Sequence, residues 1–262
     1  MRTSSLGILV VLFLMCGAAA AAELFGTVDD VDGSAVLSSV TGVTTALSVG
    51  TRIYVGQSIT TANDGEVHIV TTDSALLALR PNSNFRVERY QAKGEETDEI
   101  TFSLLKGALR SISGWIAKRN PAAYKLHTPT ATIGVRGTDH ETYILETSEG
   151  DDQPGTYDTV YEGMTVMRSE RGDTEVRPGE SAYAARDAEH APVLLARRPA
   201  FMERRSLRIE HRIQQRKESL REGIHKRMEL KNEVRKDKAE RTVRRERDAQ
   251  RPREHRKQQR PQ

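Results

Sequence analysis

The chain of 262 residues has a single cysteine, Cys16, so it can form neither an intramolecular disulfide nor a zinc site built on paired cysteines. Aromatic residues make up only 5% of the chain and hydrophobic residues 37%, a share that the apolar N-terminus raises. A chain of this composition cannot bury its whole length in one well-packed core. After residue 22, no apolar run reaches the roughly 20 residues that a membrane-spanning helix needs.

The motifs of common enzyme classes are absent as well. There is no H-E-x-x-H zinc motif, no G-x-S-x-G nucleophile elbow and no Walker-type glycine loop. Within the predicted β-rich segment, the adjacent acid–imidazole pair Asp139-His140 is the candidate for a hydrolytic or metal site. Neighbours in a strand point to opposite faces, so we expect these two side chains not to converge, and we expect His140 at the surface. We therefore assign no catalytic, cofactor-binding or metal-binding residue.

The net charge of +3 hides an uneven distribution. From Glu23 to His190 there are 15 Lys and Arg against 26 Asp and Glu, which gives −11. From Ala191 to Gln262 there are 24 against 11, which gives +13. These differences divide the chain into an N-terminal segment (1–22), an acidic body (23–190) and a basic tail (191–262).

The N-terminal segment has the pattern of an export signal. A positive residue precedes an apolar run over residues 6–15, and Ala20-Ala21-Ala22 offers an A-x-A cleavage site. We expect cleavage near Ala22, with a signal anchor that stays in the membrane as the alternative. The mature chain would then lack cysteine, which suits an oxidising, periplasmic compartment.

The acidic body has the pattern of an all-β domain. Between Leu24 and about Ala185, short runs of β-branched and aromatic residues alternate with turn signals such as Asp32-Gly33 and Asp64-Gly65. Short strands at intervals of roughly 8–12 residues are typical of all-β folds. A short-stranded sandwich and a solenoid both fit this spacing, which leaves the strand order open. Over Ser103–Arg119, two glycines favour strands joined by turns over a helix.

The basic tail is predicted to be mostly α-helical. Phe201 to Asp248 contains one glycine, no proline and many good helix formers. Its apolar residues form one narrow stripe at spacings of four and seven, namely Met202, Ile209, Ile213, Leu220, Ile224 and Met228. Ser206 and Arg216 would fall in the seam of a coiled coil and weaken it. Arg251 to Gln262 is predicted to be disordered.

The most distinctive segment of the body is Thr128-Pro-Thr-Ala-Thr-Ile-Gly-Val-Arg-Gly-Thr138. In a strand, its small apolar residues share one face, and Arg136 lies with the threonines on the other. Gly134 and Gly137 permit a close backbone approach or a bulge. We expect a central strand in which Arg136 forms one structural ion pair with a carboxylate, rather than a ligand site.

This segment resembles the signature of the FecR domain family, in which Thr-Pro-x-Ala leads into Val-Arg-Gly-Thr. Tyr161-Glu-Gly-Met-Thr-Val166 and Val176-Arg-Pro-Gly-Glu180 resemble later motifs of that family, and the resemblance covers about Leu24–Ala185. We predict that the signature positions are structural. They are Thr128, Pro129, Ala131, Ile133, Gly134, Val135, Arg136, Gly137, Thr138, Glu162, Gly163, Gly179 and Glu180.

The resemblance implies an extracytoplasmic, β-rich, non-enzymatic module. The best-known FecR proteins relay a signal from an outer-membrane siderophore receptor to a cytoplasmic sigma factor. Only about five residues precede the apolar run here, so we expect no cytoplasmic regulator segment and do not carry that role over. Asp139-His140 also departs from the family, where an acidic residue followed by an aromatic is more common.

The expected function is that of a periplasmic binding or signalling module with a tethering tail. A segment with a net charge of +13 is attracted to anionic lipid headgroups, lipopolysaccharide or acidic envelope proteins. Nucleic acid is not an expected partner for an exported chain, and no cofactor is expected. Three alternatives remain: the tail folds against its own acidic body, the protein is purely structural, or it is an envelope hydrolase that uses Asp139 and His140.

Overall fold

The computed structural model describes residues 22–187 and 189–204. Beyond these it describes residues 213–215, 217–218, 222–223, 225–226, 229–230, 233, 236–238 and 240–243. The predicted export signal, apart from Ala22, lies outside the described residues, as does the segment Arg251–Gln262. Within the described part of the chain, no helix is long and apolar enough to cross a membrane.

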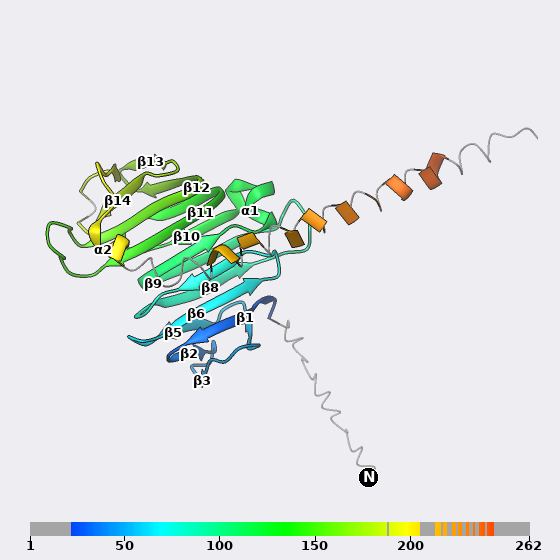
Figure 1. Ribbon diagram of the computed structural model, residues 1–262, viewed down its shortest axis with the longest axis horizontal. Coiled ribbons are helices and arrows are strands. Elements are labelled where there is room, and N and C mark those ends of the chain that lie inside the picture. The colour runs from blue at the N-terminus through cyan, green and yellow to red at the C-terminus, as the bar shows by residue number, and fades with distance from the viewer. Residues whose placement is uncertain are drawn as a thin grey trace, which may run out of the picture.

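The body is mostly β-sheet, as predicted (Figure 1). Its strands are β1 (Leu24–Asp32), β2 (Ala35–Ser38), β3 (Thr44–Ala46), β4 (Arg52–Tyr54), β5 (Ser58–Thr61), β6 (Glu66–Thr71), β7 (Leu76–Leu79), β8 (Asn84–Tyr90), β9 (Ile100–Ile112), β10 (Tyr124–His127), β11 (Thr132–Leu145), β12 (Gly155–Ser169), β13 (Gly172–Val176), β14 (Ser181–Ala185) and β15 (Val193–Leu194). The helices are α1 (Trp115–Arg119), the 3-10 turn η1 (Pro121–Ala123) and α2 (Ala200–Arg204).

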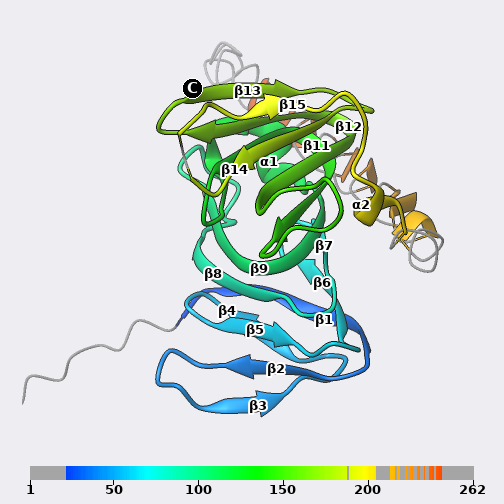
Figure 2. The ribbon, with the colours of Figure 1, turned by 90° about the vertical axis from the view of Figure 1, so that its left-hand side faces the viewer.

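These strands form one open sheet, whose longest path runs β15-β14-β12-β11-β10-β9-β7-β6-β1-β4. A branch of β8, β5, β2 and β3 leaves it at β9. Figure 2 shows how the sheet curls, with β2 and β3 at one end and β12 to β15 at the other. Nearly all pairings are antiparallel, and the exception is the parallel pair β9–β10.

Strand β9 makes the curl because its two halves have different neighbours. The first half lies between β8 and β10, and the second half lies between β7 and β11. Gly107 lies at the point where the neighbouring strands of β9 change. Its φ is +82°, and a Cβ there would lie 2.3 Å from Ser83 Oγ. Glycine is the residue that tolerates both this backbone conformation and this close approach.

Four aromatic residues form a cluster in the main hydrophobic core of the body. The ring of Phe102 on β9 lies 5.3 Å from Phe25, 5.2 Å from Phe85 and 5.6 Å from Tyr124, measured between centroids. All four rings are at most 2% exposed. Edge and tilted contacts at these distances stabilise a core beyond simple area burial, which compensates for the small share of aromatics.

Over Ser103–Arg119 the structure differs from the prediction of strands joined by turns. Strand β9 ends at Ile112, and the five-residue helix α1 follows at Trp115. Gly114, which counted against a helix, is its N-cap, and a Cβ at that position would lie 2.2 Å from Asp73 Oδ2. The amide of Trp115 donates to Asp73 O at 3.0 Å, so a contact distant in sequence starts the helix.

The body continues into the segment assigned to the tail. Strand β15 pairs with β14, and Phe201 and Met202 of α2 pack on Leu145 and Tyr157 in a second apolar cluster. The continuous helix expected over Phe201–Asp248 falls partly outside the described residues and stays a prediction. At the described positions from 213 to 243 the backbone is helical.

Candidate functional site: a buried ion network under the C-terminal segment

The Thr-Pro-x-Ala part of the signature is the turn between β10 and β11. The hydroxyl of Thr128 donates to Ala131 O at 2.7 Å and accepts from Ala131 N at 3.0 Å. Thr156 on β12 donates to the same hydroxyl at 2.9 Å. Pro129 is exposed at the tip of the turn. These bonds fix the register with which β11 enters the sheet.

The first part of β11 presents the apolar face that its alternation predicts. Ala131, Ile133 and Val135 are 7%, 0% and 3% exposed. On the opposite face a Cβ at Gly134 would lie 2.8 Å from the guanidinium of Arg168, so this glycine makes room for a side chain of β12. The small residues of the signature thus serve close packing between β11 and β12.

The Val-Arg-Gly-Thr part of the signature is a β-bulge. The register shifts between Arg136 and Asp139, where two residues of β11 oppose Gly163 of β12. Gly137 and Gly163 have φ values of +59° and +75°, and a Cβ on Gly163 would lie 2.2 Å from Gly137 O. After the bulge, Thr138 O accepts a hydrogen bond from the amide of Ser113 at 2.8 Å. The bulge therefore needs glycine at position 163 in particular.

Arg136 does not make the ion pair expected of it. Its side chain is exposed, and within the described residues it contacts no carboxylate. The bulge at Gly137 begins directly after it and leaves Arg136 outside the sheet's interior. A buried cation of this region is instead Arg110 of β9, which lies outside any motif.

The remaining signature residues lie near β12 and at the turn before β14. Gly179 has a φ of +86°, and the carboxylate of Glu180 accepts from Arg177 N at 2.8 Å. Glu162 lies on β12, opposite Asp139 of β11. Most signature residues thus shape turns and the bulge, whereas Glu162 presents a carboxylate on the face described next.

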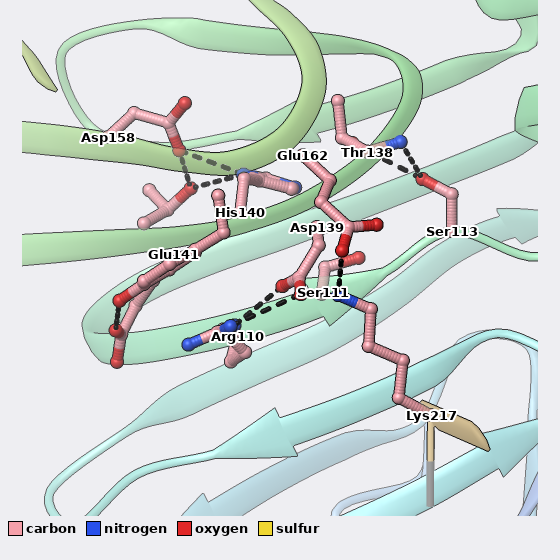
Figure 3. Close-up of polar contacts among 12 residues, drawn as sticks. Arg110, Ser111, Ser113, Thr138, Asp139, His140, Glu141, Asp158, Glu162 and Lys217 are labelled. Carbon is pink, nitrogen blue, oxygen red and sulfur yellow. Dashed lines mark hydrogen bonds and ion pairs between the residues drawn. The ribbon is translucent and has the colours of Figure 1, made fainter. Parts of the chain in front are cut away.

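Asp139 and His140 point to different sides of β11, as the strand alternation predicts (Figure 3). Asp139 is 2% exposed and accepts from Arg110 Nε at 2.6 Å and from Arg110 Nη2 at 3.2 Å. His140 is not at the surface, as we expected, but fully buried. The reason is Asp158 on β12, whose Oδ1 lies 2.8 Å from His140 Nδ1 and pairs the ring inside the sheet.

The carboxylate of Asp158 has hydrogen-bond partners different from those of Asp139. Its Oδ1 accepts from Thr142 at 2.7 Å and its Oδ2 from Thr165 at 2.7 Å. His140 Nε2 is buried, and no hydrogen-bond partner for it lies in the part of the chain that the structure describes. The acid and imidazole of the hydrolase alternative therefore belong to two different polar clusters and do not meet on one substrate position.

On the Asp139 side, charged residues of several strands form a continuous network. The guanidinium of Arg110 lies 3.5 Å from the ring centroid of Tyr161, and Tyr161 donates to Glu141 Oε2 at 3.0 Å. Arg80 Nε of the chain segment after β7 donates to Glu141 Oε1 at 3.1 Å. Arg80, Arg110 and Glu141 are each at most 5% exposed. These contacts join β7, β9, β11 and β12 through charged groups inside the fold.

Two cations of the C-terminal segment complete the network. Lys217 Nζ lies 2.7 Å from both Asp139 Oδ2 and Glu162 Oε1, and Lys217 is 4% exposed (Figure 3). Arg198 donates to the hydroxyl of Tyr161 and lies 3.5 Å from Glu141 Oε2. The basic segment therefore contacts the acidic body at defined carboxylates.

The pKa of Asp139 reflects both its burial and its partners. Burial alone would raise this pKa, but the hydrogen bonds and charges of Arg110 and Lys217 outweigh it and hold the pKa below its ordinary value of 3.8. Asp139 is thus an anion at neutral pH, and Lys217 is one of the two cations that keep it so.

Residues 57–164 match the family described as FecR protein. The chain contains a FecR domain. The match spans β5 to β12 with the Thr128–Thr138 signature, and it is narrower than the expected Leu24–Ala185. No curated protein matches the chain significantly.

Among solved structures, this chain is similar to an anti-sigma factor candidate from Parabacteroides distasonis. Two structures of it have TM-scores of 0.41 and 0.40 at 11% and 12% identity, and each match covers 53% of this chain and 59% of the other. A cell surface anchoring domain matches with a TM-score of 0.23 at 26% identity, over 24% of this chain and 82% of that one. At TM-scores below 0.5 these likenesses do not define a shared fold.

Sequence reasoning missed Arg110, Lys217 and the role of Glu141 in the FecR domain. One signal was available: Asp139 and Glu141 are two positions apart, so strand alternation places both acids on one face. The two cations that pair with Asp139, Arg110 and Lys217, lie 29 and 78 positions away from it in the chain. Pairings of that range follow from the topology of the sheet and not from a local pattern.

Proposed function

We propose that this chain is a non-enzymatic binding module of a signalling or regulatory pathway, exported to the periplasm of a bacterial envelope and held there by its basic tail. The observation that carries the proposal is the FecR match, centred on a signature whose glycines and threonines build a turn and a bulge inside the sheet. A module of this kind acts by presenting its surface to partners.

The separation of Asp139 from His140 supports a binding role over the hydrolase alternative. General acid–base catalysis needs the acid and the base within reach of one substrate. Here His140 is fully buried against Asp158, and Asp139 is 2% exposed between Arg110 and Lys217. Both groups are engaged in holding β9, β11 and β12 together.

The exposure and charge of the tail support the tether. The described residues from 222 to 243 are exposed, among them Lys226, Lys236 and Arg241. Residues 222–262 carry 15 Lys and Arg against eight Asp and Glu, a net charge of +7. A cationic segment of this size is attracted to anionic headgroups or lipopolysaccharide, and the attraction weakens as salt rises.

Deleting residues 222–262 is expected to release the protein from the envelope. This truncation keeps Lys217, which contacts the body, and removes the exposed basic part. Cell fractionation should find the full chain with the envelope at low salt and in the soluble fraction at high salt, and the truncated chain soluble in both. Replacing the exposed Leu230 and Val243 by serine keeps every charge and should leave the protein on the envelope. A full chain that is soluble at low salt would contradict the tether.

A further inference from the structure

Among the described residues, cations of the C-terminal segment balance the charge of the ion network. Counting Asp, Glu, Lys and Arg alone, the described part of the body supplies four carboxylates and two guanidinium groups to these pairs, a net charge of −2. The carboxylates are Glu66, Asp139, Glu141 and Glu162, and the cations are Arg80 and Arg110. Arg198 and Lys217 supply the two missing charges. Without them the FecR domain would present an acidic face.

We propose that Arg198 and Lys217 fasten the C-terminal segment as a strap over this acidic face, and that the same face binds a basic helical segment of a partner protein when the strap lifts. The acidic face is defined by Asp139, Glu141 and Glu162. The proposal rests on the proposed function as a binding module and names the chemistry of its partner.

The network has a fixed inner pair and a replaceable outer layer. Arg110 and Asp139 have side chains only 2% exposed and belong to the sheet itself. Glu162, by contrast, is 49% exposed and Arg198 21% exposed. Exposed members of an ion pair are screened by water and salt, so the contacts of Glu162 and Arg198 exchange at lower cost than the pair beneath them. Lys217 is buried and therefore makes the strongest contact of the strap.

The strap itself shows what kind of segment fits the face. Ile213 and Lys217 both have helical backbone and lie four positions apart, which places them on one side of a helix. Ile213 is 0% exposed and Lys217 is 4% exposed, so this side is the buried one. The matching partner is therefore a protein helix with an apolar residue and, one turn later, a lysine or arginine. An anionic lipid surface would be repelled by the same face.

The test uses a fluorescent peptide with the sequence of residues 209–228 as the probe and the full chain as the receptor. If the strap occupies the face about nine-tenths of the time, freeing it by Lys217→Ala should tighten peptide binding about tenfold relative to the unmodified chain. Adding Glu162→Gln to that variant should weaken binding again, because Lys217 of the peptide loses one carboxylate. Lys226→Ala, which removes an exposed lysine of the same segment, should bind like the unmodified chain.

Equal affinity of the peptide for the unmodified chain and for the Lys217→Ala variant would overturn the strap, as would binding that Glu162→Gln leaves unchanged. Circular dichroism checks that each variant is folded. Should Lys217→Ala unfold, Glu162→Gln alone serves, because this half-exposed residue loosens the strap without removing a buried charge, and it should raise hydrogen exchange around Ile213. Unchanged exchange there would also overturn the strap. Envelope release in the fractionation experiment does not involve Lys217, so failure of the strap and failure of the tether are distinguishable.

Discussion

Replacing Arg110 by methionine is expected to lower the free energy of unfolding by about 3 kcal/mol. The substitution leaves the carboxylate of Asp139 buried without its bidentate partner. Losing one member of a buried pair costs about 3–5 kcal/mol, and the lower end applies because Lys217 remains beside Asp139. The contact of the guanidinium with the ring of Tyr161 is lost as well. Urea unfolding of the two proteins measures the difference.

The matched control is Arg136→Met, which changes an exposed arginine of β11 and should alter stability by less than about 0.5 kcal/mol. The difference caused by Arg110→Met should also depend on pH. The pKa of the paired Asp139 is lowered, so its contribution is present above its ordinary value of 3.8 and is lost as the pH falls below it. Equal stability of the Arg110→Met variant and the unmodified protein at pH 7 would show that this pair does not hold β9 to β11.

Replacing Gly163 by alanine is expected to cost more than about 2 kcal/mol or to prevent folding, because two effects add. The φ of +75° costs an L-residue about 1–2 kcal/mol. In addition, the new Cβ would lie 2.2 Å from Gly137 O, and the backbone of the bulge would have to move apart. Thermal or urea unfolding of the purified variant gives the size of the loss.

Gly137→Ala separates the two effects. Gly137 also has a positive φ, but a Cβ there would meet nothing nearer than Lys118 Cγ at 3.5 Å, an ordinary contact. This variant should therefore lose only the conformational part, about 1–2 kcal/mol. If both variants were equally stable, the close approach of β12 to the bulge would not be the reason for glycine at position 163.

The β-rich body and the faces of its strands could be predicted because they depend on local patterns. Ile133 and Val135 alternate with polar residues, and both are buried as expected. The opposite directions of Asp139 and His140 followed from the same period of two. Helix α1 was missed because its start depends on Asp73, which is far from Gly114 in sequence.

The candidate site could be predicted only in part. His140 was expected at the surface because strand alternation turns it away from Asp139, whereas β12 brings Asp158 beside it. Arg136 was expected to pair because it lies on the threonine face of its strand in a body rich in carboxylates, but the bulge at Gly137 leaves it exposed. The docking of a basic segment on an acidic body was one alternative that the charge distribution left open. The choice of Lys217 depends on the three-dimensional fold.

The most direct test of the central claim is a zero-length carbodiimide cross-link between Lys217 and Glu162 in the full chain. Glu162 is 49% exposed and open to activation, and Lys217 Nζ lies 2.7 Å from it. Lys106 and Glu146, at 2.8 Å on the surface of the body, serve as the internal control. If the strap covers the acidic face, peptides from the monomeric protein should contain both the Lys217–Glu162 and the Lys106–Glu146 cross-link. The Glu162→Gln variant should lose the Lys217–Glu162 cross-link and keep the other. The Lys106–Glu146 link without the Lys217–Glu162 link would show that the C-terminal segment does not occupy the acidic face.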